Sequence, residues 1–265
     1  ALTGNTAGLT LAYHIDKSIR LADSNAVTPT VFYLNILANG NDILLEKGED
    51  DSKTKVYYRP AGSTEFSAYT LFEVSNAIGT AENGYKLSEY KIFGHNVTTA
   101  NTVITMNGGS VARIYGGRYD STVSVNNKTD IVINGGTVRD FVFGGGHQDT
   151  IDTETNITLS GGTVDYIYGG SESGTINGQT KVTVTGGTVN CDIYGGGYRG
   201  SVSNGTNITI TGGAIIGNVF GGGENSSTNG AKALTVGVGA KIGASGTGIV
   251  VNGGDITNGI DSFTI

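Results

Sequence analysis

The sequence contains little cysteine, proline or clustered basic charge, and each shortage excludes a class of protein. Cys191 is the only cysteine among 265 residues, so the chain has no internal disulfide and no Cys-x-x-Cys metal or redox motif. Two prolines and the lack of a G-X-Y period exclude collagen despite 45 glycines. The net charge of −7, without any basic run, argues against nucleic acid and anionic membranes as partners.

The usual motifs of membrane proteins and enzymes are missing as well. No apolar run approaches the roughly 18 residues that a membrane span requires, so we expect no membrane insertion. The three histidines lie in unrelated contexts, and neither H-E-x-x-H nor G-x-S-x-G occurs. Residues 144–152 come near the Ca²⁺-binding nonapeptide of β-rolls, but the chain does not repeat with that period. The sequence therefore predicts no cofactor, no metal site and no catalytic motif.

What the sequence has in abundance is one glycine-rich repeat. Its five clear copies begin at the glycine pairs of Gly108 (GGSVARIYGG), Gly135 (GGTVRDFVFGGG), Gly161 (GGTVDYIYGG), Gly186 (GGTVNCDIYGGG) and Gly212 (GGAIIGNVFGGG). Successive copies start 27, 26, 25 and 26 residues apart. A repeat of this length is typical of a solenoid.

Five residues that alternate between apolar and polar precede each glycine pair. They are VITMN (103–107), DIVIN (130–134), NITLS (156–160), KVTVT (181–185) and NITIT (207–211). Because successive side chains of a strand point to opposite faces, the apolar set is expected to face the interior.

Each copy then contains two further short apolar sites. The first is an aliphatic residue followed by an aromatic one, and the second follows the next glycine-rich turn, as at Val123, Ile151, Ile176 and Val202. Three short strands in about 26 residues predict one coil of a right-handed parallel β-helix, which is an all-β fold. The frequent glycines and the many Val, Ile, Thr and Tyr residues argue against a helical repeat.

Residues 1–68 lack the repeat and are predicted to form an N-terminal cap or small β-rich region, with the β-helix spanning 69–265. Thr28-Pro29 is compatible with a short helix through Leu37, whereas Val31 to Tyr33 favour a strand, so both alternatives stay open.

The repeat is degenerate at both ends of the predicted β-helix. Residues 91–95 resemble 113–117 and indicate an early coil, for which residues 70–74 would supply the preceding strand. Beyond Gly223 the pattern decays without an evident polar cap, so we expect self-association, end to end or laterally.

Stacked coils place equivalent residues in columns, and the aromatic column is the most specific one. It contains Tyr115, Phe143, Tyr168, Tyr194 and Phe220. Because the preceding aliphatic residue is predicted to point inward, the aromatic ring is expected to point outward, where a ladder of rings could stack sugars or hold a partner. The alternative is that the rings stack on one another inside, or beneath the adjacent turns, and serve stability.

Charged residues occur beside this column. The corner positions hold Arg113, Arg139, Asp140, Asp165 and Asp192, and the following turns add Asp120, His147, Asp149, Glu172, Arg199 and Glu224. Solvated turn charges are the simpler interpretation, since no motif surrounds the acids. If a ligand binds, the candidate residues are Tyr115, Phe143, Tyr166, Tyr168, Tyr194, Phe220, Asp140, Asp165 and Asp192.

At the GGTVxxIYGGG copies the chain resembles the glycine-rich β-helical repeats of bacterial cell-surface adhesin-like proteins, over residues from about 70 to 256. The resemblance implies a secreted or cell-surface protein that acts as a non-catalytic adhesin or structural stalk, with glycans or host surface proteins as partners. The alternative function is a carbohydrate-binding or polysaccharide-processing β-helix, a lyase or hydrolase, that uses Asp140, Asp165 or Asp192 as acid or base.

Overall fold

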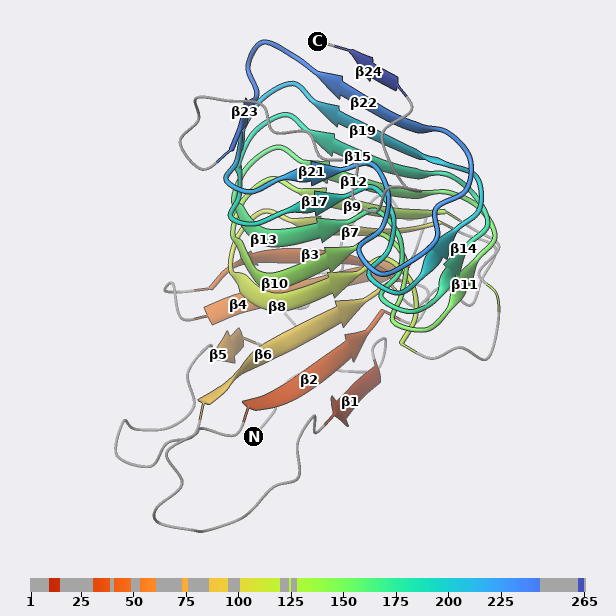
Figure 1. Cartoon of the computed structure of the whole chain (residues 1–265). Coiled ribbons are helices and arrows are strands. Elements are labelled where there is room, and N and C mark those ends of the chain that lie inside the picture. Colours follow the sequence, from red (N-terminus) through yellow and green to blue (C-terminus); the bar gives the residue numbers. More distant parts are fainter. Residues whose placement is uncertain are drawn as a thin grey trace, which may run out of the picture.

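The computed structural model describes residues 10–14, 31–38, 41–48, 53–60, 73–75, 86–94, 101–119, 124, 128–243 and 262–264. Every regular element in these ranges is a β-strand, and most strands stack in parallel as a β-helix (Figure 1). Thr102 pairs with Thr129 and Thr155 with Thr180, so equivalent strands lie 27 and 25 residues apart. The predicted all-β solenoid is confirmed. Within the described ranges no helix is long and apolar enough to cross a membrane.

The first sheet contains the alternating segments that precede the glycine pairs. In spatial order its strands are β24 (Ser262–Thr264), β22 (Lys232–Val236), β19 (Thr206–Ile210), β15 (Thr180–Val184), β12 (Thr155–Leu159), β9 (Thr129–Ile133), β7 (Thr102–Met106), β3 (Asn41–Lys47), β4 (Lys53–Pro60) and β5 (Glu73–Ser75). From β9 to β22 every second residue of these five-residue strands is buried, as the period-two pattern predicts.

The second sheet carries the aromatic column. Its strands are β1 (Thr10–His14), β2 (Val31–Leu37), β6 (Lys86–Phe93), β8 (Ser110–Tyr115), β10 (Thr137–Phe143), β13 (Thr163–Tyr168), β16 (Thr188–Val189), β17 (Ile193–Tyr194), β20 (Ala214–Ile215), β21 (Val219–Phe220) and β23 (Lys241–Ile242). A short third sheet consists of β11 (Thr150–Ile151), β14 (Thr175–Ile176) and β18 (Ser201–Val202). Its inward residues form a small cluster of their own, and the predicted third site at Val123 lies outside the described residues.

A column of buried threonines ties the start of each coil to the second sheet. The Oγ1 atoms of Thr129, Thr155, Thr180 and Thr206 each donate a hydrogen bond of 2.6 Å to a glycine carbonyl at the end of an aromatic strand. A buried hydroxyl needs such a partner, because leaving it unpaired costs about 1 to 3 kcal/mol. These bonds hold the first and second sheets in register.

The glycine pair makes the sharp turn from the first sheet to the second. Its second glycine has a positive φ, +79° at Gly162 and +77° at Gly187, a conformation that side chains with a Cβ rarely adopt. The later glycines of the repeat are needed for close packing between coils, since a Cβ on Gly169 would lie 2.2 Å from the carbonyl oxygen of Gly195.

The N-terminal strands extend these sheets. β2 pairs in parallel with β6, and β3 pairs in parallel with β7, whereas β1, β4 and β5 pair antiparallel with their neighbours. Strand β2 shows that the helix alternative through Leu37 was wrong, because pairing with β6 uses the backbone groups of Val31 to Leu37. Glu73 and Val74 belong to a strand of the first sheet, as predicted, but this strand pairs antiparallel with β4, so the expectation that it starts a parallel coil was wrong. Thr28, Pro29 and residues 70–72 lie outside the described residues, and the division at residue 68 stays a prediction.

Candidate functional site

The aromatic column is a continuous stack of rings, which we call the aromatic ladder. It consists of Phe93, Tyr115, Phe143, Tyr168, Tyr194 and Phe220. Successive ring centroids are 4.4 to 5.1 Å apart, with interplanar angles of 3° to 17°. The faces of the internal rings are therefore covered by their neighbours, and only ring edges and hydroxyls remain for a ligand to approach.

The ladder is buried from Phe93 to Tyr194 and half-buried at Phe220, so the expectation of a solvent-exposed ladder was wrong. Tyr115 is 0 % exposed, Tyr168 2 % and Tyr194 8 %. The rings form a cluster separate from the aliphatic core, as their alternation with inward residues predicts. They are nevertheless shielded, because the glycine-rich turn after each strand brings the residue four positions later against the stack. Tyr198, for example, contacts Tyr168 edge to face at 6.0 Å. The alternative, burial beneath the adjacent turns, is confirmed.

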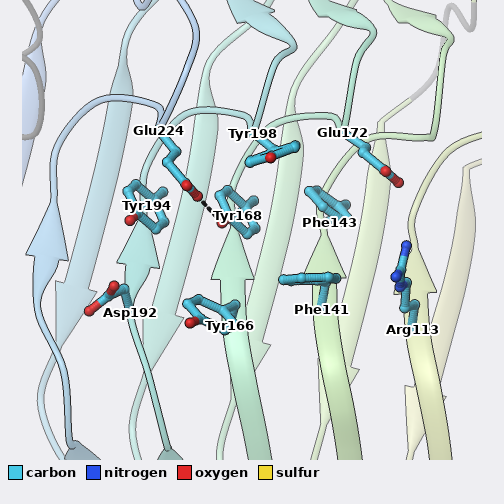
Figure 2. Close-up of a pocket in the computed structure, with 10 residues that line it drawn as sticks. All are labelled: Arg113, Phe141, Phe143, Tyr166, Tyr168, Glu172, Asp192, Tyr194, Tyr198 and Glu224. Atoms are coloured by element: carbon cyan, nitrogen blue, oxygen red, sulfur yellow. Dashed lines mark hydrogen bonds between the residues drawn. The ribbon is translucent and has the colours of Figure 1, made fainter. Parts of the chain in front are cut away.

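Two rows of side chains border the ladder. The residues two positions before each ring, which we call the flanking row, are Arg113, Phe141, Tyr166, Asp192 and Asn218. The residues four positions after each ring, the covering row, are Tyr119, His147, Glu172, Tyr198 and Glu224. Figure 2 shows Arg113 to Asp192 on one side of the ladder rings and Glu172, Tyr198 and Glu224 on the other. A groove thus follows the ladder, with one row as each wall.

The groove has a cavity volume of about 450 Å³ and combines aromatic with acidic side chains. Its lining consists of Arg113, Phe141, Phe143, Tyr166, Tyr168, Glu172, Asp192, Tyr194, Tyr198 and Glu224 (Figure 2). The volume is that of a small-molecule site. The partly exposed rings belong to the two walls, at Phe141, Tyr166 and Tyr198.

Tyrosine hydroxyls of the ladder hold two of the carboxylates. Tyr115 Oη donates a hydrogen bond of 2.5 Å to Glu172 Oε2, and Tyr168 Oη donates to Glu224 Oε2. Burial, followed by the nearby carboxylate, raises the pKa of Tyr115 and of Tyr168 well above the ordinary tyrosine value. Both phenols therefore stay protonated and keep their role as donors.

The third carboxylate is held by the backbone. Asp192 Oδ1 accepts hydrogen bonds from the Asn218 amide nitrogen at 2.7 Å and from Asn218 Nδ2 at 3.2 Å. The Tyr194 ring lies between this carboxylate and Glu224. Burial and then the charges of Glu224 and Asp192 raise the pKa of Tyr194. On the flanking row, the pKa of Tyr166 is raised to about 12, chiefly by its hydrogen bond with Cys191 and then by burial.

Arg113 is the only cation that lines the groove, and acidic and aromatic neighbours already surround it. Its Nε lies 3.1 Å from Asp140 Oδ2, and its guanidinium lies over the Phe141 ring, 4.9 Å from the centroid. The groove thus has a basic end that is neutralised within the protein and an acidic end around Tyr194.

The structure brings together five of the predicted site residues: Phe143, Tyr166, Tyr168, Tyr194 and Asp192. Tyr115 and Phe220 belong to the ladder but do not line the groove, and Asp140 touches it only through Arg113. Asp165 lies apart, where it accepts a hydrogen bond of 2.7 Å from Asn190 Nδ2.

Sequence reasoning missed the covering row as a wall. The sequence predicts solvated turn charges at Glu172 and Glu224 and does not single out Tyr198. The signal that could have found them is that the fourth residue after each ladder ring is Tyr, His or Glu in every clear copy, although the turn around it consists mainly of small residues.

Among the residues that the structure describes, no group of three or more His, Cys, Asp or Glu side chains could hold a metal ion. The groove presents ring faces, hydroxyls, carboxylates and the Arg113 guanidinium to a ligand. In comparisons with known proteins, no family model, no curated protein and no solved structure matches the chain.

Proposed function

We propose that the protein is a non-catalytic β-solenoid of the bacterial surface or secreted space, an adhesin-like module that binds a glycan in the aromatic and acidic groove. The observation that carries the proposal is the groove itself, where three partly exposed rings lie beside three carboxylates. Ring faces stack on the apolar faces of sugars, and carboxylates accept hydrogen bonds from sugar hydroxyls. Both features are contributed by consecutive coils of a rigid scaffold.

The rigidity of the site supports binding. The groove floor is a stack of buried rings, and its acidic groups are held by hydrogen bonds, so little conformational freedom is lost when a ligand enters. A preformed surface of this kind suits recognition of an extended chain that runs along the coils.

A panel of glycans, mucins and matrix proteins tests the proposal. Tyr166→Ala and Tyr198→Ala, each of which removes a partly exposed wall ring, are expected to weaken binding about tenfold or more. Tyr57→Ala is the matched control, because Tyr57 is also partly buried but lies on β4, outside the groove. Intact folding of each variant is checked by circular dichroism. If the wild-type chain binds no member of the panel, or if Tyr57→Ala weakens binding as much, the groove is not the binding site.

Cleavage of a polysaccharide is the second candidate function. It is favoured by one observation, namely that Asp192 and Glu224 flank Tyr194 from opposite walls, and two carboxylates across a groove are what glycoside hydrolysis uses. Release of reducing ends from the bound glycan, abolished in both Asp192→Asn and Glu224→Gln, would support this function over simple binding.

A further inference from the structure

We propose that the ligand of the groove carries a positive charge, and that it is a glycan of unacetylated amino sugars. This inference rests on the proposed glycan-binding function and adds the chemical class of the sugar. It starts from the charge of the groove. Three carboxylates line it, those of Glu172, Asp192 and Glu224, against the single guanidinium of Arg113. Since Asp140 is ion-paired with Arg113, the groove keeps a negative excess even when the Arg199 guanidinium beside the wall ring Tyr198 is counted.

The three carboxylates are held by neutral groups. Phenol hydroxyls donate to Glu172 and Glu224, and an amide nitrogen and a carboxamide donate to Asp192. A neutral donor orients a carboxylate without cancelling its charge. The ion pairs within the described part of the chain are Arg59–Asp42, Arg113–Asp140, Lys128–Asp130 and Lys181–Glu154, and none of them includes a groove carboxylate. Each carboxylate also keeps lone pairs that can accept from an ammonium group.

The wall rings attract cations as well. Arg113 lies over Phe141, and the Arg199 guanidinium lies 5.2 Å from the centroid of Tyr198. Tyr166 lies on the flanking wall between Phe141 and Asp192, and the described residues place no cation over its ring. A ring face beside a carboxylate is a favourable place for an ammonium group, because both attract positive charge.

An amino sugar matches this combination of groups. Its pyranose ring offers an apolar face to Tyr166, its hydroxyls offer donors, and its ammonium group carries the charge that the acidic end lacks. Acetylation of the amine removes that charge while the ring and its linkage stay the same. The degree of acetylation should therefore decide binding.

Isothermal titration of two hexamers of equal length and linkage tests the inference. One is built of β-1,4-linked glucosamine and the other of its N-acetylated form, at a pH where the free amine is protonated. We expect the wild-type chain to bind the glucosamine hexamer about tenfold or more tightly than the acetylated one. We also expect Asp192→Asn and Glu224→Gln to lose most of this preference.

Asp152→Asn is the control for unspecific attraction of a polycation to an acidic protein. Asp152 is exposed, accepts a hydrogen bond from Asn177 as Asp192 does from Asn218, and does not line the groove. Equal affinity of the wild-type chain for the two hexamers would overturn the inference and leave the glycan-binding function standing. An equal loss of preference in Asp152→Asn, or no loss in the two groove variants, would overturn it too. If neither hexamer binds, the inference is wrong, and the glycan panel alone then decides the proposed function.

Discussion

The hydroxyl of Tyr168 donates a hydrogen bond to the carboxylate of Glu224, which belongs to a coil two repeats farther along the chain. The bond spans the intervening coil, to which Tyr194 belongs, and links the groove floor to its wall. We expect Tyr168→Phe to preserve the ring stack and to lower the free energy of unfolding by about 1 to 2 kcal/mol, since a bond to a charged acceptor is lost. Chemical denaturation measures this change. A double-mutant cycle with Glu224→Gln is the control, and strictly additive losses would contradict a direct bond.

Removal of a ladder ring should be far more costly than removal of a wall ring. Tyr168 is 2 % exposed and stacks between Phe143 and Tyr194, so Tyr168→Ala leaves a cavity and is expected to cost about 3 to 5 kcal/mol. Tyr166→Ala, on the partly exposed flanking row, is expected to cost about 1 kcal/mol. Thermal and denaturant unfolding of the two variants would show the difference. Similar costs would mean that the ladder is not the buried stack described above.

The turn that contains His147 and Asp149 should make stability depend on pH. Burial raises the pKa of Asp149 to about 6, although the amide nitrogens of Arg118 and Gly146 donate hydrogen bonds to its carboxylate and oppose the shift. The folded state therefore holds this proton more tightly than the unfolded state does. The contribution of Asp149 to stability is complete below about pH 4 and is lost as the pH rises through about 6, by on the order of 3 kcal/mol.

The comparison of wild type with Asp149→Asn isolates this contribution, because the variant cannot titrate at the position. Unfolding free energies measured from pH 4 to pH 7 should fall for the wild type and change less for the variant. Parallel pH profiles would show that Asp149 does not titrate in this range.

The glycine pair should tolerate no side chain at its second position. Gly187 has a φ of +77°, and a Cβ added there would lie 2.9 Å from the Gly161 carbonyl carbon. We expect Gly187→Ala to destabilise the fold by about 2 kcal/mol or more. Gly237→Ala is the matched control, because the nearest atom to its added Cβ is 3.2 Å away and its φ is not positive. Equal denaturation midpoints for the two variants would contradict this role of the turn.

The coil architecture could be predicted from the sequence because the signal is local and repeated. The alternation Ile157-Thr158-Leu159 sets which side chains face inward, and the glycine pair that follows sets where the chain turns. Each of the five copies contains both the alternation and the glycine pair at nearly the same interval. Each copy alone is a weak pattern, but together they predict the coil strongly. The pairing Thr155 to Thr180 has the same offset as the sequence repeat.

The groove could be predicted only in part, because it depends on how a turn folds back. Alternation correctly separates Tyr168 from the aliphatic core, but it does not reveal that Tyr198 and Glu224 lie against the ladder. Asp165 and Asp192 are both corner acids in the sequence, and only their side-chain partners distinguish them. Pairing with the distant strand β6 likewise determined that β2 is a strand. The local sequence left this open, because Val31 favours a strand and Pro29 is compatible with the start of a helix.

The stacking direction also determines how the molecule responds to mechanical load. The hydrogen bonds between parallel strands run along the stack. A pull on the two ends of the β-helix would therefore break the bonds of the terminal coil first and then those of each following coil in turn. Each released coil of 25 to 27 residues would add about 90 Å of extended chain. Under tension such a β-helix would extend in steps and absorb mechanical work, while the remaining coils stay folded.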